Sequence, residues 1–365
     1  MAQAQDTPVA CSVPAKLDDG WTLATPSEAG LDPDKLCSLE RFIGRSPSAH
    51  IDGVVVVRHG RLVLERYYKG ANYRLNSTET VEFGPAVKHD LQSISKSVTS
   101  LLVGIARGEG KFPGLDAPII DHLPATYADL RTADKARITV RDLLTMASGL
   151  DWDERTLYGD PGNSARQMIL SPDMSRFVLQ RPVAFKPGEN YNYSSGDTEL
   201  LGAMLAYGVD RPIDDYARDK LFGPLGITDF EWLKAANSGQ PIASAGLRLR
   251  PRDLAKLGQL VLADGQWNGK QVMPKGWAAE STKQHIRGMG HGYGYQWWLG
   301  RSMVNGRDLP WIAGYGFGGQ RLYVQPDTGL VVVVTASEYA IPIRQQGILS
   351  LDILAGHVLA AVTGN

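Results

Sequence analysis

Strand-forming segments lie near both ends of this 365-residue chain, and helical patterns fill the stretch between them. "GVVVVRHGRLVLERYY" predicts a β-hairpin that turns at Arg58–Arg61. Three more strands are predicted from "GYGYQWWL" (292–299), "GGQRLYVQ" (318–325) and "LVVVVTAS" (330–337). The last two are joined by Pro326–Gly329, a strong turn sequence. This order favours an α+β fold: one antiparallel β-sheet built from both termini and flanked by helices, with a large, mostly helical insertion.

The middle of the chain carries four segments with apolar residues at helical spacing, several of which start with Thr, Asp or Pro and stop at Gly. They are "TVRDLLTMASGL", "DTELLGAMLAYGV", "IDDYARDKLFGPLG" and "RPRDLAKLGQLVLADG". Two further helices are expected, over about 33–44 and at the end of the chain over 344–362. We therefore expect a discontinuous sheet domain (1–92 and 285–365), a mostly helical domain (93–284) and a functional cleft between them.

Charge and hydropathy exclude several classes of function. Lys and Arg number 38 and Asp and Glu number 39, so the formal charge is -1 and no global field favours a nucleic acid or an acidic membrane. No apolar run approaches the length of a membrane span. We expect a small-molecule partner, no nucleic acid and no membrane span. The oligomeric state is not indicated.

The N-terminal segment allows two interpretations. Ala2–Ala4 follows Met1 as an Ala-x-Ala, the pattern after which signal peptidase cleaves, but no apolar stretch precedes it. The protein is either a mature exported, periplasmic chain behind a new methionine, or a cytoplasmic one with a polar tail. Cys11 and Cys37, the only cysteines, could join the N-terminal arm to the first helix in an oxidising compartment, or stay free thiols in the cytosol.

"LQSISKSVTSLLVGIA" (91–106) places polar residues at the start of an apolar helix. Ser93 falls in its first turn, where unpaired N–H groups favour an alkoxide or an oxyanion. Lys96, three residues on, shares a face with Ser93 and brings its amine within reach of the hydroxyl. One interpretation is a nucleophile beside its base, which requires an uncharged amine. The other is a helix-capping serine with a solvated lysine.

Two later segments could complete such a site. In "GENYNYSSGDTELLG", Tyr193 precedes a helix and could relay a proton to a leaving group, although Tyr191 is equally suited by its chemistry. "AGYGFGGQRLYVQ" formally matches a dinucleotide fingerprint, but strand-like residues follow where that fingerprint needs a helix. A Gly-rich strand lets backbone approach a ligand, so the Ser93 and Phe317 N–H groups could together bind an oxyanion.

Other site types are not indicated. None of the seven histidines forms a metal-binding pattern, so no metal and no cofactor are expected. No Gly-x-Ser-x-Gly elbow is present, which argues against an α/β-hydrolase. The acidic residues Asp151, Asp153 and Glu154 could mimic a catalytic carboxylate pair, but a solvated helix-entry segment is the favoured interpretation.

The order Ser-x-x-Lys, Tyr-x-Ser and Gly-rich strand resembles the serine β-lactamase and penicillin-binding-protein superfamily. Within it, the chain looks most like the class C β-lactamase-like branch, with its esterases, DD-peptidases and 6-aminohexanoate-dimer hydrolases. Connecting segments such as "LLTMASGLDWDE", "YGYQWW" and "GFGGQRLYVQPDTGLVVVV" extend the resemblance over nearly the whole chain. The resemblance implies that Ser93 is acylated, Lys96 is the base, Tyr193 shares in proton transfer and Phe317 supplies half of the oxyanion hole through its backbone.

Departures from the family pattern bear on the substrate. Many members have Asn at the position of Ser195, where it binds an acylamino group, and a serine makes fewer such bonds. Gly314-Tyr315-Gly316 stands where β-lactamases and DD-peptidases carry Lys-Thr-Gly, so the carboxylate-binding cation is missing. Arg321 or Arg344 could replace it. This loss argues against efficient β-lactamase or DD-peptidase activity.

Two aromatic positions are further candidates for substrate binding. Tyr158 lies in a loop that could overhang the cleft and contact a leaving amine. Trp297 and Trp298 alternate in a predicted strand, so one should line the cleft, and Trp297 is the candidate. The predicted function is a serine hydrolase that cleaves carboxylic esters or amides through an acyl-enzyme. The alternatives are a linear amide or oligomer hydrolase, a β-lactamase or DD-peptidase, an acyltransferase, and a catalytically silent ligand-binding homologue.

Overall fold

The two ends of the chain meet in one sheet. In the computed structural model, which describes residues 11–46, 50–74 and 77–363, strand β2 (Ile51–Arg58) lies antiparallel to β16 (Leu330–Ala336), with Val56 opposite Val332. The predicted hairpin is present, since β2 turns into β3 (Arg61–Tyr67). The Ala2–Ala4 segment lies outside the described residues.

The main sheet has nine strands among the described residues, in the order β1-β3-β2-β16-β15-β14-β13-β12-β11. Only the β1–β3 pair is parallel. The remaining strands of this sheet are β1 (Thr22–Leu23), β11 (Ile286–Gly288), β12 (His291–Tyr293), β13 (Trp298–Val304), β14 (Arg307–Gly316) and β15 (Gln320–Gln325). The predicted α+β fold with one mostly antiparallel sheet built from both termini is confirmed.

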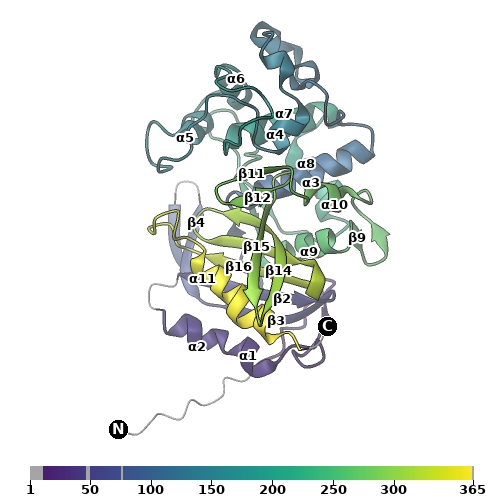
Figure 1. Ribbon diagram of the computed structural model, residues 1–365, viewed down its shortest axis with the longest axis vertical. Helices are drawn as coiled ribbons and strands as arrows, with labels where there is room; N and C mark the ends of the chain where they lie inside the picture. The colour runs from purple at the N-terminus through teal and green to yellow at the C-terminus, as the bar shows by residue number, and fades with distance from the viewer. Residues whose placement is uncertain (1–10, 47–49, 75–76, 364–365) are drawn as a thin grey trace.

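Helices cover both faces of this sheet, which explains why its central strands are apolar throughout rather than alternating. In β2, Val55 and Val57 join one core cluster and Val54 and Val56 the other, because successive side chains point to opposite faces. One face packs against α3 (Ile94–Gly108) and α9 (Pro251–Leu262), and the other against the N- and C-terminal helices (Figure 1). The nucleophile candidate at the start of α3 therefore sits on a rigid, buried element.

The helices of the sheet part are α1 (Pro33–Cys37), α2 (Leu39–Gly44), α11 (Ile348–Asp352), η6 (Ile353–Val358) and η7 (Leu359–Ala361). The remaining helices are α4 (Val140–Leu144), α5 (Ser164–Ile169), α6 (Met174–Leu179), α7 (Ser195–Val209), α8 (Ile213–Ala217), α10 (Trp277–Ser281), η1 (Ile119–His122), η2 (Ala125–Leu130), η3 (Lys135–Arg137), η4 (Arg218–Phe222) and η5 (Pro326–Thr328). No helix among the described residues is long and apolar enough to cross a bilayer.

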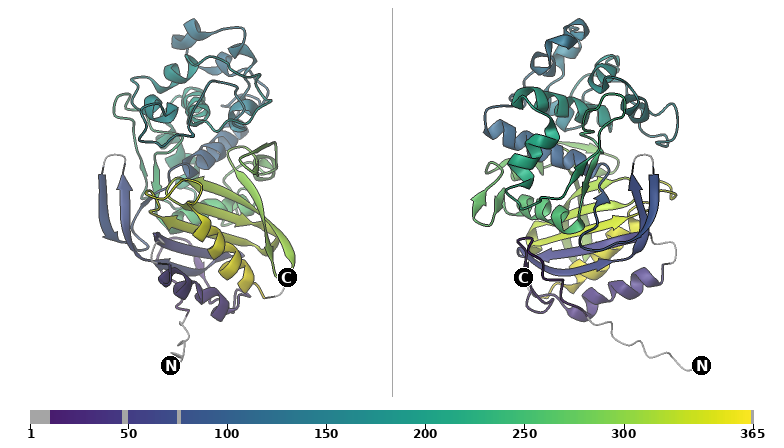
Figure 2. Two further views of the ribbon diagram at one scale, coloured as in Figure 1. Left: turned by 60° about the vertical axis from the view of Figure 1, so that its left-hand side comes forward. Right: turned by 180° about the vertical axis from the view of Figure 1, so that it is seen from behind.

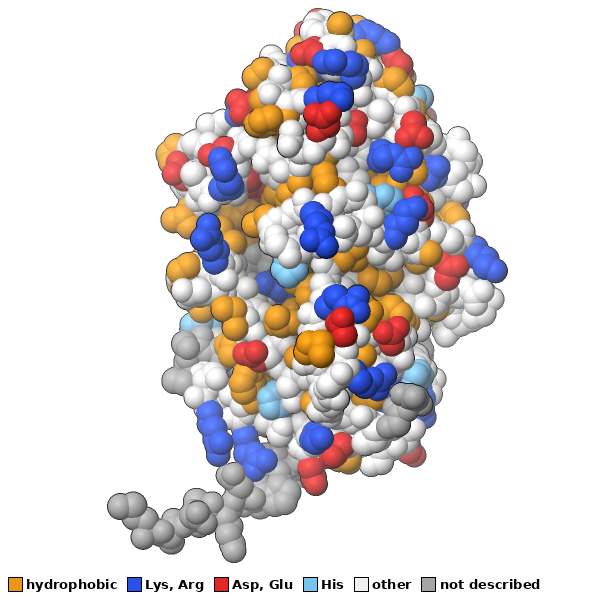
Figure 3. Space-filling model, in the orientation of Figure 1, with side chains coloured by type: hydrophobic (Ala, Val, Ile, Leu, Met, Phe, Trp, Pro, Cys, Tyr) orange, Lys and Arg blue, Asp and Glu red, His pale blue; other side chains and the backbone are white. Residues whose placement is uncertain are grey.

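Smaller β elements complete the fold. They are β4 (Lys69–Arg74) with β5 (Ser77–Glu82), β9 (Gln266–Trp267) with β10 (Lys270–Gln271), and the three-stranded set β6 (His89–Asp90), β8 (Leu247–Leu249) and β7 (Glu231–Trp232). The β4–β5 hairpin stands beside the sheet and points toward the helical part (Figure 2). Charged side chains of both signs and apolar side chains are scattered over the face shown in Figure 3.

Three predicted elements differ in their limits. The helix expected over 33–44 is split at Ser38 into α1 and α2, and the C-terminal helix starts only at Ile348, after Gly347 in a left-handed conformation. The segment 292–299 is not one strand: Gln296 has a φ of 65°, and β13 starts at Trp298. The Cys11–Cys37 disulfide, one of the two options left by the sequence, joins the N-terminal arm to α1.

Candidate active site

A constrained turn presents Ser93 at the start of α3. Gln92, the residue before it, has a φ of 49°, a backbone conformation that is costly for residues other than glycine. The Asp90 carboxylate holds this conformation by accepting hydrogen bonds from the Gln92 backbone N–H at 3.0 Å and its side-chain amide at 2.9 Å. Burial raises the pKa of Asp90 to about 6, and the bonds from Gln92 oppose that rise. The turn thus sets the position of the serine before any substrate binds.

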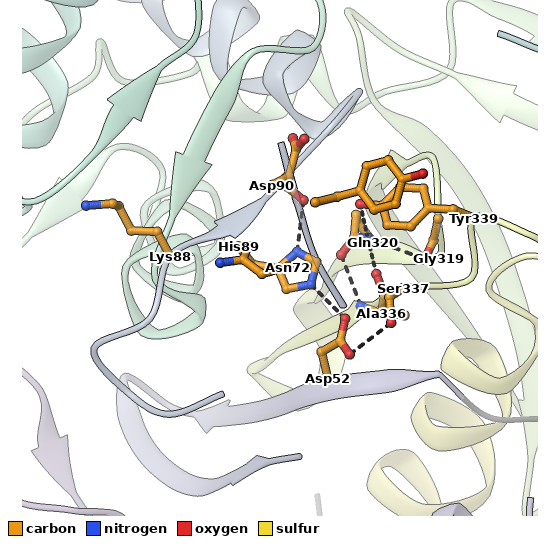
Figure 4. Close-up of polar contacts among 12 residues, drawn as sticks. Asp52, Asn72, Lys88, His89, Asp90, Gly319, Gln320, Ala336, Ser337 and Tyr339 are labelled. Atoms are coloured by element: carbon orange, nitrogen blue, oxygen red, sulfur yellow. Dashed lines mark hydrogen bonds and ion pairs between the residues drawn. The ribbon is translucent and has the colours of Figure 1, made fainter. Parts of the chain in front are cut away.

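A buried polar network supports this turn from below (Figure 4). The Asp52 carboxylate contacts His89 Nε2 at 2.8 Å and accepts from Ser337 Oγ at 3.1 Å, and His89 Nδ1 lies 3.0 Å from the Asp90 carbonyl oxygen. Ser337 directly follows Ala336, whose backbone pairs with the Gln320 side-chain amide. The network therefore connects the strand leading to Ser93 with the residues next to the Gly-rich turn.

Ser93 and Lys96 are in contact. Lys96 Nζ lies 3.1 Å from Ser93 Oγ, and the lysine is only 2% exposed. Ser93 makes no side-chain capping bond to its helix. The interpretation of a capping serine with a solvated lysine is thereby wrong, and the two side chains have the arrangement that a nucleophile and its base require.

The amine of Lys96 has two further partners. It lies 3.0 Å from Ser195 Oγ and 3.0 Å from the carbonyl oxygen of Ser244. All three hydrogen-bonding partners are uncharged. Ser244 was not identified from the sequence, because no local pattern marks a carbonyl that approaches the amine from 148 residues away.

Tyr193 lies beside Lys96, whereas Tyr191 does not. The amine stands 5.0 Å from the centroid of the Tyr193 ring, which stacks on Trp298 at 5.9 Å. Tyr191 packs edge-on against Tyr293, and its buried hydroxyl has no hydrogen-bond partner within the described part of the chain. The geometry therefore separates two tyrosines that the sequence left equivalent.

Glu154 is a component of the site that sequence reasoning misjudged. The expectation of a solvated acidic segment is wrong for this residue, which is 8% exposed. Its Oε1 accepts from Ser195 Oγ at 2.7 Å and from the Tyr158 hydroxyl at 2.9 Å, and its Oε2 accepts from Ser195 N at 2.7 Å and Trp152 Nε1 at 2.8 Å. Burial, followed by the charge of Glu154, raises the pKa of Tyr158 well above its usual value, so this phenol stays a donor. The segment Trp152-x-Glu154 did not predict the burial of Glu154, because only the fold shows which acidic residue turns inward.

The Gly-rich strand packs directly on the residues around Ser93. A Cβ added to Gly314 would lie 3.2 Å from both Ile94 Cγ2 and Ser97 Oγ, and one added to Gly316 would lie 2.4 Å from the Leu91 carbonyl oxygen. No side chain longer than hydrogen fits at Gly316 without displacing backbone. Close packing thus requires glycine at Gly316, whereas a Cβ at Gly314, the family's cation position, would need its neighbours to shift by only a few tenths of an ångström.

Phe317 follows directly after this strand, beside the turn that carries Ser93. Its ring contacts Tyr158 at 5.0 Å and Tyr339 at 5.5 Å between centroids. The next residue, Gly318, is fixed by a 2.7 Å bond from its N–H to Gln346 Oε1. The pairing of the Ser93 and Phe317 N–H groups in one oxyanion site stays a prediction.

Tyr315 and the arginines occupy defined places. The Tyr315 ring stacks on Trp298 at 5.5 Å and lies 4.2 Å from the guanidinium carbon of Arg321. Arg321 donates to the carbonyl oxygens of Gly316, Gln320 and Gln346 at 3.2, 2.8 and 2.8 Å, so its donors are engaged by backbone. Arg344 is exposed. The engagement of Arg321 by these three carbonyl oxygens argues against its replacing the missing cation.

The expectation for Trp297 needs correction. Its side chain is completely buried in the core cluster of the α3 side, and it lies in the turn before β13 rather than in the strand. Trp298 contacts Tyr193 instead. The error arose because the positive φ of Gln296 interrupts the alternation that a continuous strand would have imposed.

A surface groove lies apart from the Ser93–Lys96 contact. This groove of about 880 Å³ runs along strands β11–β14, with His291 and Trp311 in its lining, but neither Ser93 nor Lys96 lines it. The ring centroids of His291 and Tyr315 lie 6.2 Å apart, and Tyr315 stacks on Trp298. The groove therefore adjoins these aromatic side chains rather than the Ser93–Lys96 contact. The described residues include no group of three His, Cys, Asp or Glu side chains placed to hold a metal ion.

Comparison with known proteins agrees with this arrangement. A family model described as Beta-lactamase matches residues 39–344. The chain belongs to the Beta-lactamase family. The predicted enzyme class, a serine hydrolase related to β-lactamases and penicillin-binding proteins, is confirmed by this membership.

Relatives within and around the Beta-lactamase family are distant. The 6-aminohexanoate-dimer hydrolase of Paenarthrobacter ureafaciens is 24% identical over 337 residues, which cover 86% of this chain and 80% of that protein. A candidate D-alanyl-D-alanine carboxypeptidase of Escherichia coli (strain K12) is 24% identical over 258 residues, but the match spans only 58% of its length and 67% of this chain. The structure of a candidate 6-aminohexanoate-dimer hydrolase from Bacillus anthracis matches with a TM-score of 0.70 at 20% identity, covering 92% of this chain and 84% of that one, and shows the shared fold.

Proposed function

We propose that this protein hydrolyses carboxylic esters through an acyl-enzyme formed on Ser93. The observation that carries the proposal is the 3.1 Å contact between Lys96 Nζ and Ser93 Oγ, made by a lysine that is 2% exposed. A hydroxyl becomes an effective nucleophile when an adjacent base accepts its proton as it attacks. Lys96 lies on α3 one turn from the serine, and this position supports the proposed role.

The reaction has two halves. Uncharged Lys96 takes the Ser93 proton while Oγ bonds to the ester carbonyl carbon, and the N–H groups of Ser93 and Phe317 bind the oxyanion. The proton then passes to the departing alcohol, with Tyr193 sharing in the transfer, and the carbon–oxygen bond of the ester breaks. In the second half, the same base takes a proton from a water molecule while the water oxygen bonds to the acyl carbon. The bond between that carbon and Ser93 Oγ then breaks, the carboxylic acid leaves, and Ser93 recovers its proton.

The surroundings of Ser93 favour esters over substrates that carry a carboxylate next to the reacting group. Gly314 occupies the position at which β-lactamases and DD-peptidases present a lysine, and the guanidinium of Arg321 is engaged by three carbonyl oxygens. An alcohol is also an easier leaving group than an amine, which must be protonated before it departs. Efficient turnover of β-lactams and D-Ala peptides is therefore not expected.

Hydrolysis of linear amides is the second candidate. It is favoured by the similarity to the 6-aminohexanoate-dimer hydrolase over 86% of this chain. The Tyr158 ring contacts the Phe317 ring edge-on, and because its hydroxyl donates to Glu154, its oxygen could meet a leaving amine only as an acceptor. Transfer of the acyl group to an added alcohol or amine would use the same acyl-enzyme.

Covalent labelling tests the proposal. The protein is treated with a fluorophosphonate, and the adduct is mapped by mass spectrometry in the unmodified chain and in Ser93→Ala. Ser97→Ala is the matched control, because this serine lies one turn along the same helix and bonds to the Gln296 carbonyl oxygen at 2.7 Å. We expect the label on Ser93, lost in Ser93→Ala and kept in Ser97→Ala. Label on another residue would refute the proposal.

A substrate panel then separates the candidates. It contains p-nitrophenyl esters, 6-aminohexanoate dimers, nitrocefin and D-Ala peptides. Turnover of esters well above the other three supports the proposal, and turnover of the dimers above the esters would replace it with the amidase. Faster capture of the acyl group by an added alcohol than by water would indicate an acyltransferase.

A further inference from the structure

The carboxylate of Glu154 is surrounded by hydrogen-bond donors. On Oε2 both donors are N–H groups, from the Ser195 backbone at 2.7 Å and the Trp152 indole at 2.8 Å, and neither can be reversed. On Oε1 both are hydroxyls, those of Ser195 at 2.7 Å and Tyr158 at 2.9 Å. A serine hydroxyl has a single proton, so the proton of Ser195 is directed to Glu154 and not to any other neighbour.

This direction decides how Ser195 meets Lys96. Because its proton is on the Glu154 side, Ser195 Oγ must accept a hydrogen bond from Lys96 Nζ across their 3.0 Å contact. The Ser244 carbonyl oxygen, also 3.0 Å from the amine, can only accept. An uncharged amine has two protons and one lone pair. Both protons are used, and the lone pair is left for the third neighbour, the Ser93 hydroxyl at 3.1 Å.

We propose that Glu154 is a positioning residue, which orients the lone pair of Lys96 toward Ser93 by accepting the proton of Ser195. The inference rests on the proposed acylation of Ser93 and extends it by a residue that touches neither substrate nor nucleophile. Without an acceptor at Oε1, Ser195 could donate to the amine. The lone pair would then face Ser195, an N–H would face Ser93, and the amine could not accept the nucleophile's proton.

Glu154→Gln is the variant that reverses this direction with little change of shape. Its amide oxygen has to take the Oε2 position, because the two fixed N–H donors point there. Its NH₂ group then stands at the Oε1 position and donates to the Ser195 oxygen, so the Ser195 proton is turned toward Lys96. We expect acylation of Ser93 to slow by about 10- to 100-fold, with kcat for an ester falling and KM nearly unchanged.

A double-mutant cycle shows whether the effect passes through Ser195. Fluorophosphonate labelling rates of Ser93 and ester kinetics are measured for the unmodified protein, Glu154→Gln, Ser195→Ala and the double variant, with melting temperatures for each. In the Ser195→Ala background there is no hydroxyl at residue 195 whose proton could turn toward Lys96. Glu154→Gln is therefore expected to change the labelling rate by less than about 3-fold there, a strong non-additivity.

Each outcome decides a separate point. Label absent from Ser93 in the unmodified protein would overturn the proposed function itself. Label on Ser93 at an equal rate in Glu154→Gln, or an equal slowing by Glu154→Gln with and without Ser195, would overturn only the positioning role of Glu154. If Glu154→Gln does not fold, the comparison rests on Ser195. Ser195→Thr, which keeps a hydroxyl, should then recover most of the acylation rate that Ser195→Ala loses, and failure to do so would count against the inference.

Discussion

The α-carbon of Gly316 faces the main-chain oxygen of Leu91 so closely that an added Cβ would lie 2.4 Å from it. Leu91 stands two residues before Ser93, so the end of strand β14 and the turn that presents the serine are pressed together. Real Cβ atoms do not approach a carbonyl oxygen to this distance. Gly316 is thus fixed by packing and not by any conformational demand of its own φ.

Gly316→Ala tests this contact. The methyl group has to push the backbone of Leu91 or of Gly316 aside, and overpacking of this kind costs about 1–3 kcal/mol in the free energy of unfolding. Acylation of Ser93 should slow as well, since both the serine and Phe317 adjoin the displaced segments. Gly84→Ala is the control, because nothing lies within 4 Å of a Cβ built there. Urea unfolding of both variants with equal midpoints would contradict the packing described.

Lys96→Met should slow acylation severely while the protein stays folded. Methionine is of similar length, so it fills the space of the lysine stem without leaving a large cavity, but it has no amine to accept the Ser93 proton. General base catalysis contributes about 10²–10⁴-fold to a rate, and we expect a loss in that range. The measurement is the second-order rate of fluorophosphonate labelling, with circular dichroism as the check on folding. A labelling rate within a few fold of the unmodified protein would exclude Lys96 as the base.

Tyr193→Phe and Tyr191→Phe form a matched pair. Removal of the Tyr193 hydroxyl should lower kcat for a p-nitrophenyl ester by about 10²-fold or more, because this ring lies next to the Lys96 amine. Removal of the Tyr191 hydroxyl should leave kcat unchanged and keep or raise stability, since that hydroxyl is buried without a partner within the described residues. If Tyr191→Phe is the slower of the two, the assignment of the proton-transfer tyrosine is wrong.

Asp197 should make stability depend on pH near neutrality. Burial raises its pKa to about 7, although Ser148 donates to its Oδ1 at 2.7 Å, and its Oδ2 has no partner among the described residues. The unfolded chain has an aspartate pKa of about 3.9. Between these values the folded state holds a proton that the unfolded state has released, so the free energy of unfolding falls as the pH rises toward 7 and then levels off.

Asp197→Asn should remove the part of this dependence that Asp197 contributes, while Asp90, whose pKa is raised to about 6, keeps its own part. The contribution of the group cannot exceed about 1.4 kcal/mol per pH unit, and the variant should match the unmodified protein near pH 4 but exceed its stability at pH 8. Denaturant unfolding at pH 4 to 8 measures the difference. Curves that stay parallel over this range would show that Asp197 does not titrate there.

The contact between Ser93 and Lys96 was predictable from a short sequence pattern. Residues three apart on a helix share a face, so Ser93 and Lys96 could be expected in contact from their spacing alone. The strand patterns at both ends and the turn at 326–329 likewise predicted the antiparallel sheet, because alternation, turn residues and continuous apolar runs are local signals. The absence of a lysine at Gly314 was also visible in the sequence.

The other groups around Lys96 come from distant parts of the chain, and their contacts became visible only in the folded protein. The Ser244 carbonyl oxygen reaches Lys96 from 148 residues away, and Glu154 turns inward while its acidic neighbours Asp151 and Asp153 do not. Whether Trp297 or Trp298 faces Tyr193 depended on one residue of positive φ, which periodicity cannot reveal. Contacts of this kind follow from how elements pack against each other. Local sequence patterns do not encode that packing, because it depends on residues far apart in the chain.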